Sequence, residues 1–323
     1  MKLDLTIHKG NPDKPVVIFV HGLGVDKKFW TDPADSKVMG RNIPMKIFAA
    51  VKPEAHPVKP GKINISAGDV PEKIDNLWTA VINRGFNAVC WSQSRPVGPI
   101  DVAVRELEKV MEKVRMNFPG KTAAIVCHSR GGLIARKFME RKVPEIKAMI
   151  TISSPHAGSS LSRLGKYLYP LLPFLKKTLP QETHGTISKT LKRIHDLLDG
   201  NALKELLPDS DFIKNLKDPP SEDILYLSFG GTEAKLLTIY KMKKSDSRFY
   251  PKPLLDIPDS LLKHLPASII PKEVVTGKGD FLVTAESSVL PLAQKHYNLP
   301  ENHLSISWNK KMIAETLELL EKI

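Results

Sequence analysis

Residues 122–134, TAAIVCHSRGGLI, place an apolar run, a sharp turn and the start of a helix next to one another. The run that ends at Cys127 has the length of a buried strand, and residues 131–141 have the spacing of an amphipathic helix. A serine on such a strand-to-helix turn projects above the carboxyl edge of the sheet, where the first helical N–H groups face developing negative charge. Ser129 is therefore the candidate nucleophile.

Strand-like and helix-like segments alternate on both sides of this stretch, which predicts an α/β fold with a mostly parallel sheet flanked by helices. The expected strands are residues 15–20, 86–91, 122–127, 148–153, 224–229 and 273–276. The expected helices are residues 71–84, 101–117, 131–141 and 311–323.

Two segments interrupt the alternation. Residues 41–70 form a proline-rich and basic insertion without helical periodicity, and residues 157–222 form a longer interruption with an apolar piece at 167–179. A connection of that length is usually functional or a subdomain. We therefore expect a core of residues 1–156 and 223–323, with residues 157–222 as an inserted helical lid.

The composition argues against several classes of protein. The 323 residues carry a formal net charge of +13, but the charges are spread along the chain and do not interleave with aromatic residues as in a stacking platform for nucleic acid. We expect a solvated basic surface and no nucleic-acid partner, and attraction to an anionic lipid surface stays open. Cys90 and Cys127 lie in apolar runs and are expected to be reduced core thiols.

The N-terminus, MKLDLTIHKG, has no apolar stretch of the kind found in a signal peptide, and no segment is long enough to span a membrane. This pattern favours a cytoplasmic protein, or a secreted one whose leader has been removed. No cluster of metal-binding residues is evident, so we expect neither a metal nor a cofactor.

Five motifs resemble those of bacterial lipases and esterases of the α/β-hydrolase type. They are HGLG at 21–24, AIVCHSRGGLIARKF at 124–138, TISSPHAGSSL at 151–161, GKGDFLVTAESS at 277–288 and ENHLSIS at 301–307. Their order and rough spacing match over nearly the whole chain. The resemblance implies hydrolysis of carboxylic esters through an acyl-enzyme intermediate. One departure is Cys127, which fills the first glycine position of the usual G-x-S-x-G turn.

The motif order Ser, Asp, His selects the remaining catalytic candidates. His303 is the expected base, with His296 as its rival. Asp280 is the expected acid, with an Asx-turn role as the alternative and Glu286 as the substitute.

Other roles follow from the turn and from the resemblance. The backbone N–H groups of Leu23 and Arg130 are the expected oxyanion donors. Ser129 could instead serve as a helix N-cap, which would leave the other motifs unexplained. In the predicted lid, Leu168, Leu172 and Phe174 are expected either to line a pocket for lipophilic acyl chains or to hold the lid to the core.

The sequence therefore favours a serine esterase or lipase acting on small-molecule or lipid esters. A thioesterase, an acyltransferase or an amidase could use the same three residues. A non-catalytic lipid-binding or partner-binding scaffold is a further alternative. The sequence leaves the oligomeric state open.

Overall fold

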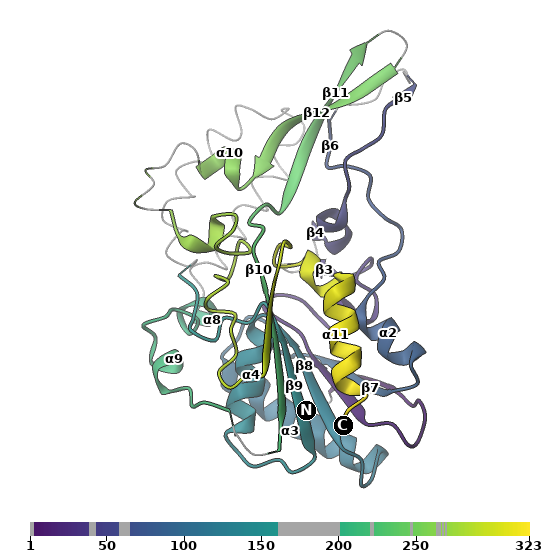
Figure 1. The fold of residues 1–323 in the computed structure, drawn as a ribbon, viewed down its shortest axis with the longest axis vertical. Helices are drawn as coiled ribbons and strands as arrows, with labels where there is room; N and C mark the ends of the chain where they lie inside the picture. The colour runs from purple at the N-terminus through teal and green to yellow at the C-terminus, as the bar shows by residue number, and fades with distance from the viewer. Residues whose placement is uncertain are drawn as a thin grey trace.

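A seven-stranded sheet forms the centre of the computed structural model (Figure 1). The structure describes residues 3–38, 43–57, 65–160, 201–219, 223–245, 248–262, 266, 268 and 270–323. The strands, in spatial order, are β1 (Asp4–His8), β7 (Asn87–Ser92), β2 (Val16–Val20), β8 (Ala123–His128), β9 (Ile146–Ile152), β10 (Leu225–Gly231) and β13 (Lys295–Leu299). β1 is antiparallel to β7, and the pairings from β7 to β13 are parallel.

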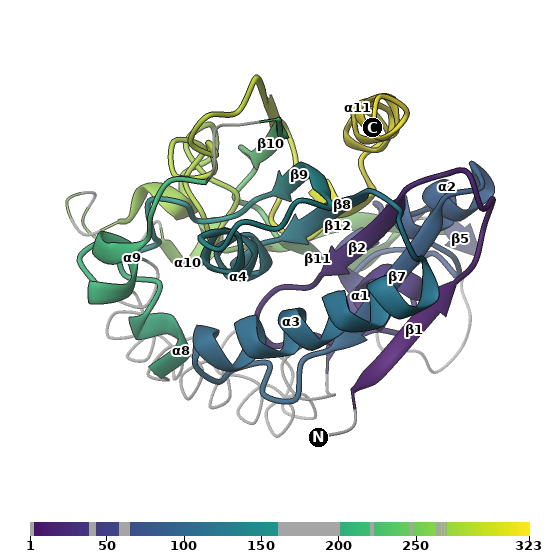
Figure 2. The ribbon, with the colours of Figure 1, turned by 90° about the horizontal axis from the view of Figure 1, so that it is seen from below.

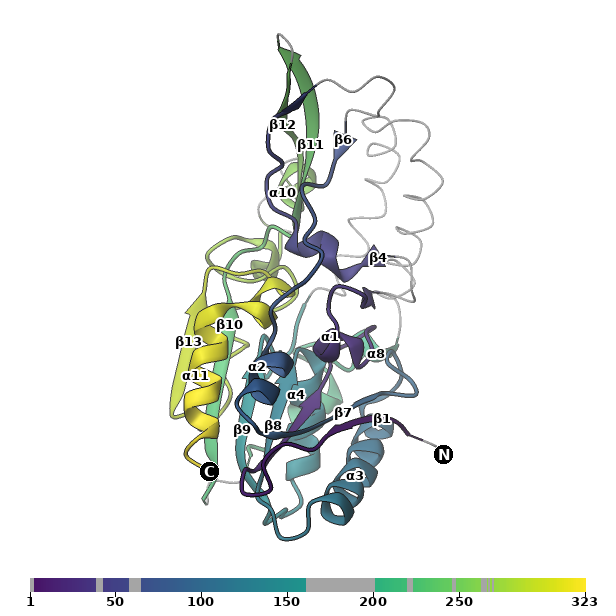
Figure 3. The same ribbon diagram turned by 90° about the vertical axis from the view of Figure 1, so that its right-hand side faces the viewer.

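Helices cover both faces of this sheet. One face packs against α3 (Ile100–Asn117) and α4 (Arg130–Met139), and the other against α2 (Leu77–Asn83) and α11 (Lys310–Leu320), as Figures 2 and 3 show. β2 is buried along its whole length because alternate residues enter the two layers. Its continuous apolar run, VVIFV, is what a parallel strand covered on both sides requires.

The predicted elements around the Ser129 turn are confirmed to within two residues at each end, namely β2, β7, β8, β9, β10, α3 and α4. The predicted C-terminal helix is confirmed as α11, which ends at Leu320, three residues before the expected end. The helix expected at 71–84 begins only at Leu77. Asn76 caps it, because the Asn76 side chain accepts a hydrogen bond from the Thr79 N–H at 2.9 Å. The chain before this cap, including Pro71, is not helical.

The strand expected at 273–276 is wrong. The segment forms a 3-10 turn, Lys272–Val274, and then bends at Gly277, which has φ of +87°. The last parallel strand is instead β13, whose sequence KHYNL alternates only weakly.

The predicted irregular insertion contributes short pieces to a second sheet. Its elements are β4 (Ile43–Pro44), the 3-10 helix Met45–Ala49, β5 (His56–Pro57) and β6 (Ile65–Ser66), and β4 pairs with β3 (Lys37–Val38). β5 and β6 flank a long hairpin made of β11 (Leu237–Ser245) and β12 (Arg248–Ile257), in the order β5-β12-β11-β6. The sequence analysis did not identify this hairpin, which projects away from the central sheet in Figure 1.

Only the ends of the predicted lid belong to the described residues. α8 (Asn201–Lys204) and α9 (Asp211–Asn215) are described, whereas Leu168, Leu172 and Phe174 lie outside the described part. The two ends meet, since the Ser159 N–H donates to the Leu206 carbonyl at 2.7 Å. The described segments on either side of residues 161–200 are therefore in direct contact.

Two further small helices are α1 (Lys28–Thr31) and α10 (Asp259–Leu262), and a 3-10 turn, Ser305–Trp308, precedes α11. Among the described residues, no helix is long and apolar enough to cross a membrane.

Candidate active site

Ser129 occupies the turn between β8 and α4 in a strained backbone conformation. Its φ of +55° and ψ of −131° are unusual for a residue with a side chain. Two backbone hydrogen bonds hold the turn, from Ser129 N to the Ile152 carbonyl at 2.9 Å and from Gly132 N to the Ser129 carbonyl at 3.0 Å. The neighbouring strand β9 and the helix α4 therefore impose the sharp turn on Ser129.

Glycines allow neighbouring segments to approach this turn. A Cβ on Gly131 would lie 2.5 Å from the Val20 carbonyl oxygen, and a Cβ on Gly132 would lie 2.6 Å from the Ser154 Cβ. A Cβ on Gly22 would lie 2.8 Å from the Ser129 Cβ. Each distance is too short for a real side chain, so the loop after β2, the loop after β9 and the turn fit together only with glycine at these positions.

Cys127 packs as a core residue, as the sequence predicted. It is fully buried in β8, and burial raises the pKa of its thiol well above the usual value. Burial likewise raises the pKa of Cys90, to about 12. Neither thiol is suited to act as a nucleophile at neutral pH, because the reactive form is the thiolate.

The structure brings His303 and Asp280 together. His303 Nδ1 lies 3.0 Å from Asp280 Oδ2, and both side chains are almost completely buried. The other carboxylate oxygen, Oδ1, accepts the N–H groups of Leu282 at 3.0 Å and Val283 at 2.8 Å. Asp280 is therefore an Asx-turn residue and a partner of His303 at once, because its two oxygens have separate contacts.

His128 connects the Ser129 turn to the loop that carries His303. Its Nε2–H donates to the His303 carbonyl at 2.7 Å, and the two ring centroids are 4.8 Å apart. The His128 ring also stacks on Phe29, with centroids 4.5 Å apart. Burial, and then the charge of His303, lower the pKa of His128 well below its usual value, so the ring stays neutral.

The remaining ring nitrogen of His303 has no partner among the described residues. Nε2 is buried and makes no hydrogen bond with any described residue, and none joins it to Ser129 Oγ. In a free enzyme such catalytic contacts are often long and tighten only with substrate. A buried nitrogen without a partner, close to a strained serine turn, is available for proton transfer.

His21 fixes the loop that carries Leu23. Its Nε2 accepts the Gln93 N–H at 3.0 Å, so the proton is on Nδ1, which donates to the Gly22 carbonyl at 2.9 Å. Burial lowers the pKa of His21 to about 4, against a weaker raising contribution from the Gly22 hydrogen bond. Within the described part of the chain, the Leu23 N–H has no acceptor.

Arg130 contributes more than its backbone. Its N–H is the first of α4, where no carbonyl one turn earlier is available to accept it. Its buried guanidinium donates to Gln93 Oε1 at 3.2 Å, to the Pro96 carbonyl at 3.3 Å and to the Gly98 carbonyl. Burial lowers the pKa of Arg130 to about 10, so the group stays charged at neutral pH.

Sequence reasoning missed the roles of Gln93, His128 and the Arg130 side chain. The role of the Arg130 side chain could have been predicted from the sequence. A charged side chain directly after the serine of a buried turn must either point to solvent or donate hydrogen bonds to buried acceptors. No comparable signal marked Gln93, which reaches His21 and Arg130 only through the tertiary fold.

The rival candidates make other contacts. His296 Nδ1 lies 2.8 Å from Ser228 Oγ, and its Nε2 lies 3.0 Å from Asn298 Oδ1. Glu286 pairs with Lys272 at 3.5 Å on the surface. No group of three or more potential metal ligands occurs among the described residues.

Comparisons with known proteins agree with this architecture. A family model described as serine aminopeptidase, S33 (Hydrolase_4), matches residues 84–204. The mature form of the Bacillus licheniformis lipase BlEst2 has a TM-score of 0.56 and 16% identity, over 98% of this chain and 97% of that chain. Its propeptide form has a TM-score of 0.54 and 16% identity, over 98% of this chain and 53% of that chain. A search of curated proteins finds no match.

We assign the fold from the strand order, the serine turn between β8 and α4 and these similarities. The chain has the α/β-hydrolase fold, as its resemblance to bacterial lipases and esterases predicted.

Proposed function

We propose that this chain is a serine hydrolase that cleaves carboxylic esters. The observation that carries the proposal is the buried His303–Asp280 pair in the same cluster as the Ser129 turn. The Nε2 atom of His303 has no partner among the described residues. A buried carboxylate that holds one ring nitrogen leaves the other in the correct tautomer to accept a proton. The lipase BlEst2, with the same fold, supports esters as the substrate class.

The proposed reaction has two halves. His303 Nε2 takes the Ser129 hydroxyl proton while Oγ attacks the ester carbonyl carbon, and the N–H groups of Leu23 and Arg130 stabilise the oxyanion. His303 then protonates the leaving alcohol, and an acyl group remains on Ser129. Water, activated by the same nitrogen, releases the acid and restores the serine. Asp280 stabilises the imidazolium in both halves.

The substrate is proposed to be a small-molecule or lipid ester with an apolar acyl chain. This part rests on the apolar sequence 167–179 and on the division into a core, 1–156 and 223–323, and a lid, 157–222. Burial of a methylene contributes about 0.8 kcal/mol, so an apolar lid can select longer chains.

Amide hydrolysis is the second candidate, because the matching family model is described as a serine aminopeptidase. A panel of p-nitrophenyl esters, thioesters and p-nitroanilides separates these reactions. We expect ester turnover to dominate and to fall by at least about 1,000-fold in Ser129→Ala. The exposed Ser268→Ala serves as the control and should retain full turnover. Anilide turnover above ester turnover would contradict the proposed substrate class.

A further inference from the structure

The hairpin β11–β12 has one face that is almost entirely cationic. Register places Lys241 opposite Lys252, Lys243 opposite Tyr250 and Ser245 opposite Arg248. Side chains of directly paired residues and of residues two apart share a face. All six of these side chains are exposed, and we call them the cationic face.

The opposite face of the hairpin is partly covered, and Lys244 and Pro253 on it are exposed. Met242 is buried, and Phe249 and Pro251 are partly buried. The hairpin thus has the two-sided character of a half-buried antiparallel sheet, in which the exposed side is normally mixed in charge. Here the exposed side carries four positive charges and no acidic side chain.

This arrangement costs stability. Like charges directly opposite each other, such as Lys241 and Lys252, destabilise a strand pair. None of the four cations of the cationic face forms an ion pair with a described residue. Like-charge pairing that no described residue compensates is typical of a functional surface.

The surroundings of the cationic face favour a lipid bilayer as the partner. Tyr250 is 47% exposed and Leu254 on the same strand is 42% exposed, and an aromatic or aliphatic side chain among lysines suits the boundary between headgroups and acyl chains. Pro251 and Pro253 lack N–H groups, so β12 is poorly suited to pair with a strand from another protein.

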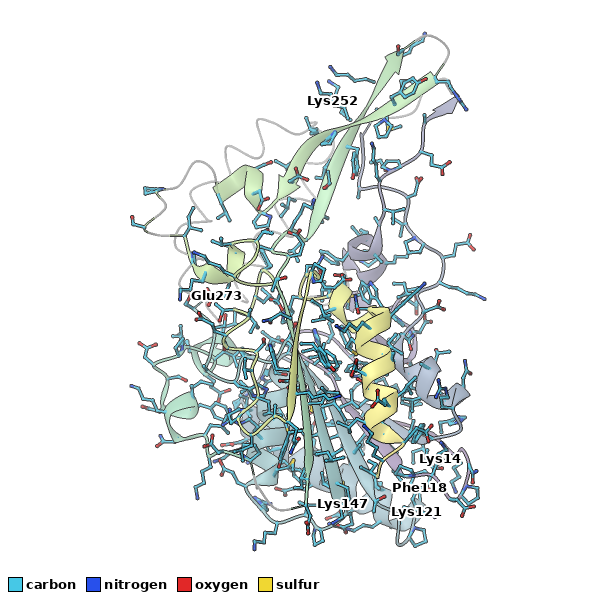
Figure 4. All side chains as sticks on the ribbon, in the orientation of Figure 1. Lys14, Phe118, Lys121, Lys147, Lys252 and Glu273 are labelled. Atoms are coloured by element: carbon cyan, nitrogen blue, oxygen red, sulfur yellow. The ribbon has the colours of Figure 1, made fainter. Side chains whose placement is uncertain are left out.

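The hairpin also starts near the candidate active site. β10 is parallel to its neighbour β9, which in turn is parallel to β8, so β10 ends at the same edge as Ser129. Gly231 at its end packs against Asp280, where a Cβ would lie 2.6 Å from the Asp280 Cβ. β11 then begins at Leu237. Lys252 lies midway along the hairpin, where it pairs with Lys241, and at the opposite end of the molecule from Lys121 and Lys147 (Figure 4).

We propose that the cationic face of the hairpin docks onto an anionic lipid surface. Lysine and arginine near such a surface add attraction that falls with ionic strength. Binding of the hairpin to lipid does not depend on the proposed function. Its benefit does rest on the proposed function, because docking would deliver lipid esters to the edge of the sheet that carries Ser129.

The test measures flotation of the Ser129→Ala protein with phosphatidylcholine vesicles that contain or lack phosphatidylserine. This variant separates lipid binding from hydrolysis. The lipid-docking proposal and the proposed hydrolase function can therefore be contradicted independently. The hairpin variant replaces Lys241, Lys243, Arg248 and Lys252 by Gln. The control variant replaces Lys109, Lys113, Lys121 and Lys147 by Gln, which removes the same charge from α3 and the opposite end.

We expect binding to the phosphatidylserine vesicles, weakened about a hundredfold in the hairpin variant and by less than about threefold in the control. High salt should release the parent protein. The hairpin variant should keep or raise its melting temperature, because it removes charge repulsion across the strands. In Tyr250→Trp, a blue-shifted difference spectrum on these vesicles should report entry into the interface.

Three results would overturn the proposal. The first is equal binding to vesicles with and without phosphatidylserine. The second is an equal loss of binding in the hairpin and control variants. The third is tighter binding of the cationic face to single-stranded RNA than to the anionic vesicles, without a spectral shift of Tyr250→Trp.

Discussion

At the scale of single residues, the side chain of His128 contacts the loop of His303, which its position beside Ser129 in the sequence does not indicate. Its Nε2–H donates to the His303 carbonyl, and its ring lies between Phe29 and His303. This hydrogen bond connects the strand that leads to Ser129, the proposed nucleophile, with the loop that carries His303, the proposed base. We infer that His128 is a positioning residue for His303.

His128→Phe keeps an aromatic ring but removes the donor to the His303 carbonyl. We expect kcat for ester hydrolysis to fall by about tenfold with little change in KM, since a hydrogen bond of about 1 kcal/mol that positions the base is lost. Stability should fall by about 1–3 kcal/mol because a buried carbonyl loses its partner. Stopped-flow kinetics and urea unfolding measure the two effects. An unchanged kcat would show that His128 acts in packing alone.

His21 links stability to pH. Its folded pKa of about 4 lies below the unfolded value near 6.5, so between these values the unfolded state binds more protons. The stabilisation is therefore complete above about pH 6.5 and is lost as pH falls towards 4.

Urea unfolding at about pH 7.5 and about pH 5 measures this effect. For His21→Asn we expect the loss of stability between the two pH values to shrink by about 2 kcal/mol relative to the parent protein. His128 and His156, whose pKa values burial also lowers, remain to give a residual slope. A loss as large as that of the parent protein would contradict a neutral, buried His21.

At the scale of elements, glycine decides whether the serine turn can form. A Cβ on Gly131 meets the Val20 carbonyl, which is part of a central strand and cannot move aside. Gly120 is a matched control, because it has φ of +73° but nothing within 4 Å of a Cβ.

Gly131→Ala is expected to abolish ester turnover and to lower stability by about 1–3 kcal/mol. Gly120→Ala should cost about 1–2 kcal/mol through its left-handed backbone and leave turnover intact. Thermal unfolding and initial rates distinguish the two. Full activity of Gly131→Ala would contradict this prediction, because it would mean that β2 can move away from the added methyl group without loss of the turn.

The proposed lid gives a second prediction at this scale. Replacing Leu172 or Phe174 by Ser should reduce turnover of long acyl esters more than that of acetate, because an apolar wall contributes about 0.8 kcal/mol per buried methylene. Chain-length profiles from acetate to palmitate, at a temperature where the variants stay folded, are the measurement. Parallel profiles would show that these side chains only hold the lid to the core.

Elements with strong local signals were predictable and those made by tertiary pairing were not. β2 and β8 are continuous apolar runs, and α3 repeats its apolar residues at helical spacing. β13 has mostly polar and partly exposed residues, and the hairpin strand β11 reads LTIYKMKKS. Such edge and surface strands are stabilised by their partners, so their own sequences carry little periodicity.

The residues of the candidate site likewise divide into those that the sequence predicted and those that only the tertiary structure reveals. Ser129, Asp280 and His303 were found from local turns and their order along the chain, and the structure places His303 against Asp280. Gln93 and His128 act through contacts with residues 72 and 175 positions away. No pattern in one sequence reports such contacts.

At the scale of the whole molecule, the common direction of the parallel strands brings several features to one edge of the sheet. The Ser129 turn, the loop of Leu23, the loop of His303 and the root of the hairpin all follow the carboxyl ends of parallel strands. Asp280 does not directly follow a strand, but it lies against Gly231 at the carboxyl end of β10. In an open α/β sheet this edge is where ligands bind. The proposed hydrolysis and the proposed lipid docking therefore share one end of the protein.

Labelling by a fluorophosphonate tests the central claim, that Ser129 is an activated nucleophile, most directly. Intact-mass and peptide mass spectrometry should find one adduct per chain on Ser129, none in Ser129→Ala, and labelling slowed by at least about 100-fold in His303→Ala. The Ser268→Ala control should label like the parent protein. Failure of the folded parent protein to react, or an adduct that persists in Ser129→Ala, would contradict the account.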